Sequence, residues 1–285
     1  MFIRTVYKLQ KLRWNLSYTM LILILLIASI IVISPIAYAL ATSLRIPSES
    51  FTLPPRWIPI PPDFSNYEAV FSTVPLGHYV VNSMFITLSI VVAQVATSAL
   101  AGYAFARLNF PAKNLLFWLI LATMMIPQQA TIIPVFVEIS KIGLADTRSA
   151  LILPAVATAF GTFLMRQYFM RIPNEFEEAA LIDGASHWRI FWSIYLPMVR
   201  PGLTVLAILS FNGYWNEFLR PLVFLKSIDK FTLPLGLVNL QGYMGTGSIS
   251  VVLAGVIISL LPVLIIYILG QRYLVEGIML GGLKA

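Results

Sequence analysis

The sequence predicts an all-α integral membrane protein with six transmembrane helices. Of its 285 residues, 59% are hydrophobic and only 11% are charged, whereas soluble domains carry about 25% charged residues. The mean hydropathy is +0.85. Six segments approach the roughly 20 apolar residues that a helix needs to cross a hydrocarbon core about 30 Å thick. These observations together favour a multispanning helical protein.

The predicted spans lie near residues 18–43, 79–105, 114–137, 149–168, 202–225 and 250–270. The first two are long enough to cross the bilayer with some tilt. The first contains about 25 apolar residues without a small-residue cleavage site, so it predicts a retained helix and not a signal peptide. Pro127 and Pro134 in the third span, and Pro262 in the sixth, remove helical hydrogen bonds and predict bends.

Basic residues set the expected orientation. Arg4, Lys8, Lys11 and Arg13 precede the first span, and basic loops are held in the cytoplasm. The N-terminus is therefore predicted to be cytoplasmic, and six spans return the C-terminus to the same side. The predicted organisation is a cytoplasmic N-terminus (1–17), a first helix (18–43), an extracytoplasmic loop (44–78), a five-helix core (79–270) with a cytoplasmic loop (170–200), and a cytoplasmic tail (271–285).

Composition and motifs argue against several functions. The net charge is +7, but the basic residues are spread over the loops, which indicates topology and not nucleic-acid binding. There is no cysteine and no glycine followed by lysine, so thiol chemistry and a phosphate-binding P-loop are excluded. His78 and His187 lie outside the spans and form no zinc-binding HExxH pair. We expect no metal, cofactor or catalytic centre on this chain.

Polar residues in the fifth span are the candidates for a substrate pathway. Glu217 and Arg220 are three residues apart and can form an ion pair on one helix face, although ionisable groups in spans are often functional. Asn212, Trp215 and Asn216 share a face at i, i+3 and i+4. Amide and aromatic groups suit the hydroxyls and ring faces of a sugar. The alternative is that these amides bond neighbouring helices. With Glu217, the three form the predicted pathway.

Small residues line one side of the second span. Two adjacent rows carry Ala93, Thr97 and Ala101, and Ser98, Gly102 and Ala106. Small side chains at this spacing let helix backbones approach closely. We therefore expect this side to pack against another helix.

The cytoplasmic loop predicts two short helices. Asn174 with Glu177 three residues later resembles a capping box and starts a helix near 175–182. Asp183 and Gly184 end it, because glycine takes the left-handed C-terminal position without steric cost.

A second helix begins near Ser186 and ends at Pro197. Its aromatic residues fall at i, i+3, i+4 and i+7, which predicts a single face that rests on the bilayer; they are Trp188, Phe191, Trp192 and Tyr195. The acidic first helix then points away from the membrane.

The spacing within this loop resembles a known family. Glu178-Ala179-Ala180, three residues, Gly184, nine residues and Ile194-Tyr195-Leu196-Pro197 match the pattern EAA-x3-G-x9-I-x-L-P of permease subunits of binding-protein-dependent ABC importers. Segments 82–88, 101–110, 165–186, 215–222 and 271–285 resemble the carbohydrate branch of that family, so the resemblance covers nearly the whole chain. The final GGLKA departs slightly from the GAVKG that relatives often carry.

The resemblance implies a type I ABC importer permease fold in which the loop is a coupling helix. Its docking tip on a separate ATP-binding subunit would comprise Glu178, Ala179, Ala180, Asp183 and Gly184, supported by Ile194, Leu196 and Pro197. ATP and Mg would bind that partner, and this chain would not be an enzyme. The implied assembly holds a homologous second permease, two ATP-binding subunits and an extracytoplasmic solute-binding protein around a sugar pathway.

Three alternatives stay open from the sequence. A glycerol-phosphate importer of the same family fits the same motifs. A self-contained secondary transporter or channel would show carboxylates near the midplane or paired half-helices, and neither pattern is evident. A membrane enzyme would need a nucleophile and base that the sequence does not offer.

Overall fold

The computed structural model describes residues 2–50, 57–242 and 247–282, with side chains described for 18–50, 57–242 and 247–273. Within those ranges the protein is helical and contains no strand. The basic residues of the N-terminus, on which the predicted orientation rests, lie outside the described side chains, as does most of the predicted tail 271–285.

Three long helices confirm the first, second and sixth predicted spans. They are α1 (Phe2–Ser43), α3 (Leu76–Arg107) and α14 (Ile249–Gly282). Each contains a stretch long and apolar enough to cross a membrane. Pro262 lies inside α14 without interrupting it, so the bend expected there does not break the helix.

The other spans are broken helices. α4 (Lys113–Thr123) and α5 (Gln128–Lys141) meet at 100°. The break falls just before α5, whose first turn follows Pro127, as predicted. α6 (Arg148–Ile152) and the 3-10 turn η2 (Leu153–Ala155) meet α7 (Ala159–Met170) at 42°. With each bent pair counted as one span, the described residues contain up to six spans.

The fifth predicted span is wrong in its bounds. α11 (Arg200–Trp215) ends ten residues early, and α12 (Leu219–Phe224) follows as a separate helix. Pro221 explains the break, because its ring clashes with the carbonyl four residues earlier and it donates no hydrogen bond. Instead, α11 forms a bent pair with the preceding segment His187–Met198, at 73°.

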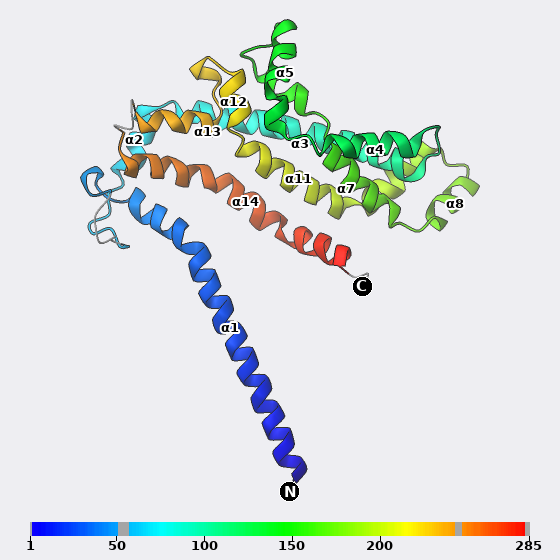
Figure 1. Cartoon of the computed structure of the whole chain (residues 1–285), viewed down its shortest axis with the longest axis horizontal. Helices are drawn as coiled ribbons and strands as arrows, with labels where there is room; N and C mark the ends of the chain where they lie inside the picture. Colours follow the sequence, from blue (N-terminus) through cyan, green and yellow to red (C-terminus); the bar gives the residue numbers. More distant parts are fainter. Residues whose placement is uncertain (1, 51–56, 243–246, 283–285) are drawn as a thin grey trace.

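The helices form an elongated bundle (Figure 1). α3 packs against α7 and α11, and α11 packs against α14. The predicted small-residue side of α3 is where α7 approaches: a Cβ on Gly102 would lie 2.6 Å from that of Met165, and a Cβ on Gly161 would lie 2.2 Å from the Ser98 hydroxyl. α5 and α12 project from one side of the bundle, and α8 (Glu175–Ile182) lies at one end.

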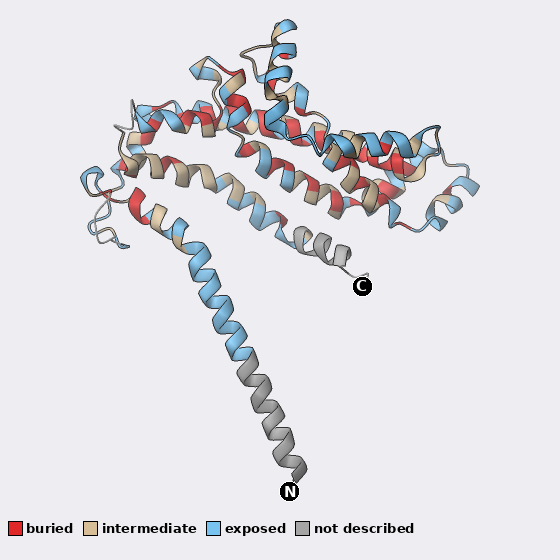
Figure 2. Ribbon diagram, viewed as in Figure 1, coloured by how far each residue is buried: buried red, intermediate tan, exposed pale blue. Residues whose placement is uncertain are grey.

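Short elements close the opposite end of the bundle. They are η1 (Pro47–Glu49), α2 (Ser65–Thr73), α13 (Leu233–Leu237) and η5 (Val238–Gln241). η4 (Ile228–Lys230) follows α12 and contacts the turn between α5 and α6 through Lys230 and Asp146. Asn66 of α2 donates hydrogen bonds to the carbonyls of Ser43 (3.0 Å) and Arg45 (2.7 Å). These bonds fix the last turn of α1, and the rest of its described length is largely exposed (Figure 2).

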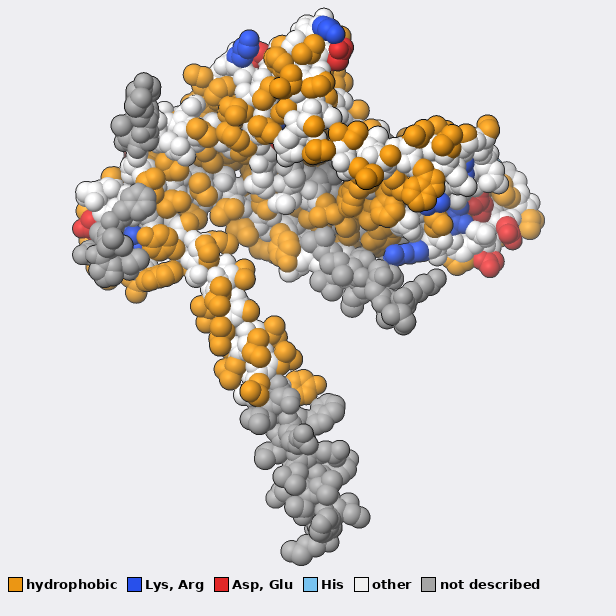
Figure 3. Space-filling model, viewed as in Figure 1, with side chains coloured by type: hydrophobic (Ala, Val, Ile, Leu, Met, Phe, Trp, Pro, Cys, Tyr) orange, Lys and Arg blue, Asp and Glu red, His pale blue; other side chains and the backbone are white. Residues whose placement is uncertain are grey.

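The surface follows the same division. Apolar side chains cover most of the visible bundle, while Lys, Arg, Asp and Glu gather around α8 and around the tips of α5 and α12 (Figure 3). A broad apolar surface with charged side chains confined to projecting segments suits a helical bundle that lies within a bilayer.

Candidate docking site and transmembrane pocket

The first loop helix forms where the sequence predicts it. α8 spans Glu175–Ile182, and Gly184 follows it with φ of +76°. The Gly184 N–H donates to the Leu181 carbonyl (3.0 Å) and the Ala185 N–H to the Ala180 carbonyl (2.9 Å). These two bonds are a Schellman motif, which satisfies the last carbonyls of the helix. The predicted left-handed glycine is confirmed.

The predicted capping box is wrong. Asn174 has helical dihedral angles and its side chain makes no capping bond. Its Oδ1 accepts from the Arg107 guanidinium, and the Glu177 carboxylate accepts from the Tyr195 hydroxyl at 2.7 Å. The Asn174 amide and the Glu177 carboxylate therefore join α8 to other elements and do not cap the helix.

The tip of α8 presents most of the predicted docking residues. Glu178, Ala179, Asp183 and Gly184 are exposed. Ala180 is only 9% exposed and packs in a buried cluster with Tyr103, Phe169 and Tyr195, here called the inner cluster. Its predicted place on the docking surface is therefore corrected: it anchors the helix. An alanine fits there because α8 lies close to the bundle on that side.

Sequence reasoning missed three exposed apolar residues on α8. Phe176, Leu181 and Ile182 are 47%, 45% and 86% exposed. Large apolar side chains exposed beyond a membrane belt mark contact surfaces. Their presence in an otherwise charged helix was the available signal.

The second loop helix contains a π turn. α9 (His187–Ile190) begins after Ser186, whose hydroxyl accepts from the Arg189 N–H at 3.3 Å. A π-helical segment (Phe191–Tyr195) and α10 (Leu196–Met198) follow. Pro197 therefore lies one residue before the end. Ile194 and Leu196 are half-buried against the inner cluster; their supporting role stays a prediction.

The predicted single aromatic face is wrong. Phe191 and Tyr195 are 2% and 0% exposed, whereas Trp188 and Trp192 are 61% and 51% exposed. The four residues cover about 100° of the helix surface. The edge of the buried core lies within that width, so residues on its two sides differ in burial. One pair packs inward, and only the tryptophans face outward.

Arg107 joins the loop to the bundle. Its guanidinium donates to the carbonyls of Phe169 (2.5 Å) and Ile172 and to the Asn174 side chain. It also lies 4.9 Å from the centre of the Tyr195 ring. The ends of α3 and α7, the start of α8 and the π turn therefore meet at one side chain. Its partners are more than 60 residues away in sequence, so no local sequence pattern could predict these contacts of Arg107.

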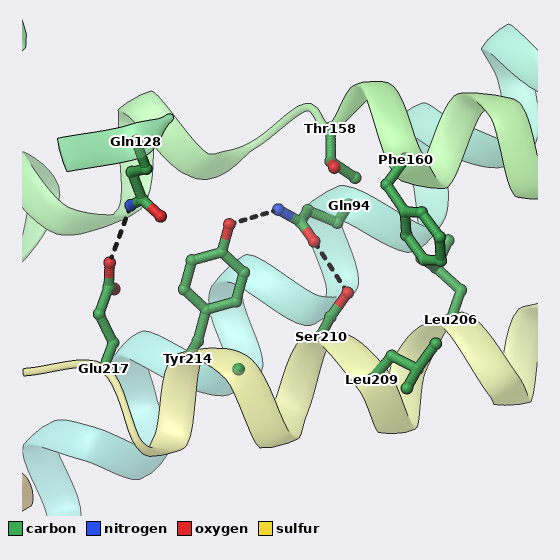
Figure 4. A pocket seen from close by; sticks show the side chains of 10 residues that line it. Gln94, Gln128, Thr158, Phe160, Leu206, Leu209, Ser210, Tyr214 and Glu217 are labelled. Carbon is green, nitrogen blue, oxygen red and sulfur yellow. Dashed lines mark hydrogen bonds between the residues drawn. The ribbon is translucent and has the colours of Figure 1, made fainter. Parts of the chain in front are cut away.

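A polar cavity of about 290 Å³ lies between α3, α7 and α11 (Figure 4). It is lined by Gln94, Gln128, Thr158, Phe160, Leu206, Leu209, Ser210, Gly213, Tyr214 and Glu217. Gln94 donates to the Tyr214 hydroxyl (2.7 Å) and the Ala155 carbonyl (2.8 Å), and its Oε1 accepts from Ser210 (2.8 Å). The buried amide thereby fixes the orientation of both hydroxyl groups.

Glu217 closes one side of this cavity. Its carboxylate accepts from Gln128 (3.2 Å) and from Arg220 (2.6 Å). The ion pair considered from the sequence therefore forms, but it bridges the break between α11 and α12. The Arg220 side chain is 7% exposed and lies 5.4 Å from the centre of the Tyr214 ring.

The structure divides the predicted pathway residues. Trp215 is 1% exposed, its Nε1 donates to the Ser259 carbonyl at 3.0 Å, and its ring stacks on Phe211. Asn212 and Asn216 are exposed and bond each other at 3.2 Å. The three therefore do not share an environment, because α14 covers the indole. Only Glu217 of the predicted set lines the cavity.

The cavity face of α11 follows a helical period that the sequence already contained. Ser210, Gly213, Tyr214 and Glu217 fall at i, i+3, i+4 and i+7 and all line the cavity. Gln94 of α3 joins them from across the bundle. The residues that mark the cavity in the sequence are therefore this set, and not Asn212, Trp215 and Asn216.

An apolar helical bundle with broken spans and a polar cavity between them defines a multispanning membrane transport protein. The chain belongs to the family of binding-protein-dependent transport system inner membrane components, whose model matches residues 94–278. Members of this family are membrane permease subunits of ABC importers. The chain is accordingly a multi-pass protein of the cell membrane.

Relatives of known name agree with this assignment. The chain is 40% identical to the arabinooligosaccharides transport system permease protein AraQ of Halalkalibacterium halodurans, over 71% of this chain and 72% of that one. It is 34% identical to the diacetylchitobiose uptake system permease protein NgcG of Streptomyces coelicolor, over 90% and 86%. It is 32% identical to the sn-glycerol-3-phosphate transport system permease protein UgpE of Yersinia pestis, over 90% and 94%.

A solved structure is also similar. It is the crystal structure of a bacterial ABC transporter involved in the import of the acidic polysaccharide alginate. One of its chains superimposes with a TM-score of 0.79 at 27% identity, covering 88% of this chain and 94% of that one. The bundle thus shares its overall fold with a chain of a solved ABC importer.

Proposed function

We propose that this chain is one of two homologous permease subunits of an ATP-driven importer that carries a carbohydrate into the cell. Two relatives are named for oligosaccharide uptake. ATP and Mg bind separate ATP-binding subunits in this proposal, and a solute-binding protein delivers the cargo on the outer side. The single observation that carries the proposal is the exposed tip of α8, held to the bundle by Arg107 and Tyr195.

The geometry supports a coupling role for α8. The helix exposes Glu178, Asp183 and an apolar surface, which suits insertion into a groove on a partner. Glu177 ties α8 to the π turn through Tyr195, and Arg107 ties it to α3 and α7. A displacement of α8 must therefore move these elements together, as rigid-body transitions require.

A second candidate is import of glycerol phosphate by the same machinery. The observation that favours it is the 32% identity to a permease named for that cargo. It shares the coupling mechanism and differs only in the cargo.

Gly184→Val tests the coupling assignment. The position has φ of +76° and open space around a Cβ, so valine adds backbone strain and bulk at the tip without an internal clash. We expect the variant to insert normally but to lose ATP-driven transport. Gly143→Val is the matched control, because Gly143 has φ of +75° and equally open surroundings in the turn between α5 and α6.

The measurement is ATP-dependent uptake by complexes reconstituted with the ATPase and binding protein, alongside ATPase retained on purification. If Gly184→Val transports as well as Gly143→Val with its ATPase bound, α8 is not the coupling element.

A further inference from the structure

We propose that the cavity between Gln94, Tyr214 and Glu217 is a transit site that selects an uncharged, hydroxyl-bearing cargo. The inference rests on the proposed function and decides between its two cargo classes. The first class is a neutral sugar, and the second is an anionic cargo such as a sugar acid or a phosphate.

The first step is the orientation of the hydroxyl groups. The Tyr214 oxygen accepts from the Gln94 amide at 2.7 Å, so its own hydrogen can be donated into the cavity. The Ser210 hydroxyl gives its hydrogen to Gln94 at 2.8 Å, so its lone pairs remain as acceptors. Gln94 is only 2% exposed and its partners are fixed. The cavity therefore presents a donor and an acceptor at set positions.

The second step is the mixed character of the wall. Gln128 donates to Glu217 and keeps its carbonyl as an acceptor, and Thr158 adds a hydroxyl. Phe160, 40% exposed, faces the same space with Leu206 and Leu209 (Figure 4). Donors, acceptors and an aromatic surface together match a sugar, whose hydroxyls both donate and accept and whose ring faces are apolar. Ligand sites generally occupy roughly 300–1,000 Å³. At about 290 Å³ this cavity lies at the lower limit of that range, which suits a short segment of an oligosaccharide and not the whole molecule.

The third step is charge. Glu217 is the acidic residue among those described around the cavity, and no lysine or arginine lines it within the described part of the chain. The nearest guanidinium, that of Arg220, is 7% exposed and is paired with Glu217 at 2.6 Å. A phosphate or carboxylate here would lose its water and meet a carboxylate with no free cation to compensate. A neutral polyol meets no such opposition.

The first experiment measures ATP-dependent uptake by the complete complex in proteoliposomes. The neutral probes are arabinotriose and diacetylchitobiose, and the anionic probes are glycerol-3-phosphate and an alginate trisaccharide. We expect uptake of at least one neutral probe, at ten times or more the rate of either anionic probe. Equal or preferential uptake of an anionic probe overturns the inference and leaves ATP-driven import intact. Absence of ATP-dependent uptake for both classes contradicts the proposed function itself.

The second experiment assigns the selectivity to this cavity. Tyr214→Phe keeps the ring over Arg220 and removes the donated hydrogen, so uptake of the neutral probe should fall roughly two- to tenfold while the ATPase stays bound. Tyr267→Phe, at a 53% exposed tyrosine of α14, makes the same chemical change away from the cavity and should have no effect. Equal uptake by the two variants shows that the cavity does not contact cargo.

Glu217→Gln tests the charge argument separately. It keeps the shape and leaves the Arg220 charge unbalanced, so the ratio of anionic to neutral uptake should rise at least threefold. An unchanged ratio in an assembled complex overturns the role of charge.

Discussion

Asp146 shows how one residue can organise two loops on the outer side of the predicted topology. With φ of +55°, its carboxylate accepts from the N–H groups of Lys226 (2.8 Å) and Ser227 (3.0 Å) and from the Lys230 ammonium (3.1 Å). Burial raises the pKa of Asp146, but the hydrogen bonds from Ser227, Lys226 and Lys230 outweigh it and hold the pKa well below 3.8. The charged form is therefore stabilised by folding.

Asp146→Asn should lower thermal stability at neutral pH and have less effect in acid. Because the folded pKa is depressed, the stabilisation is present above the unfolded pKa of about 4 and is lost as pH falls towards the folded value. The measurement is the melting temperature of both proteins from pH 7 to below pH 4. A difference that stays constant over this range would show that the charge of Asp146 contributes nothing.

Glu178 is the exposed carboxylate expected to contact the ATPase. Reversing its charge should cost about 1 to 3 kcal/mol of a charge-assisted contact. Glu178→Lys should therefore weaken retention of the ATPase on purification. Glu175→Lys changes the same net charge at another exposed position of α8 and should weaken it less. Equal retention by both variants at low and high salt would argue against a direct contact.

At the scale of elements, apolar length predicted the helices better than polarity predicted their faces. α1, α3 and α14 follow directly from long apolar runs. On α11, the trio Asn212, Trp215 and Asn216 and the set Ser210, Tyr214 and Glu217 have equally good helical spacing. Only the packing of α14 over the indole decides between them, and that contact is invisible in a single sequence.

Trp215→Ala should act on stability and not on cargo. The indole is buried between α11 and α14, and removing a large buried aromatic typically costs about 3 to 5 kcal/mol. We expect a clear fall in melting temperature with uptake per folded complex unchanged. Trp118→Ala, at a 68% exposed residue of α4, is the control and should melt close to wild type. Lost uptake in a Trp215→Ala protein of normal stability would restore the indole to the pathway.

At the scale of the whole molecule, α3 connects the two candidate sites. Arg107 at its end holds the loop that contains α8, and Gln94 thirteen residues earlier orients the hydroxyl groups of the cavity. At 1.5 Å per residue, these side chains are about 20 Å apart along one helix. The helix α8 could be predicted from sequence, because the residues of the loop motif are contiguous; its docking role stays a proposal. The link to the cavity could not be predicted, because it depends on contacts among four segments.

The π turn at Phe191–Tyr195 means that the spacing of the loop motif fixes the direction in which side chains point as well as the length of the segment. In a regular helix each residue turns the chain by about 100°, whereas a π turn holds one residue more in the same turn. The nine residues between Gly184 and Ile194 therefore fix the rotation of the following side chains about the helix axis. They set which side chains of the segment itself face the bundle, namely Phe191 and Tyr195, and which face outward. Loss of one residue here would shorten the segment little, yet it would turn Phe191 and Tyr195 away from Phe169.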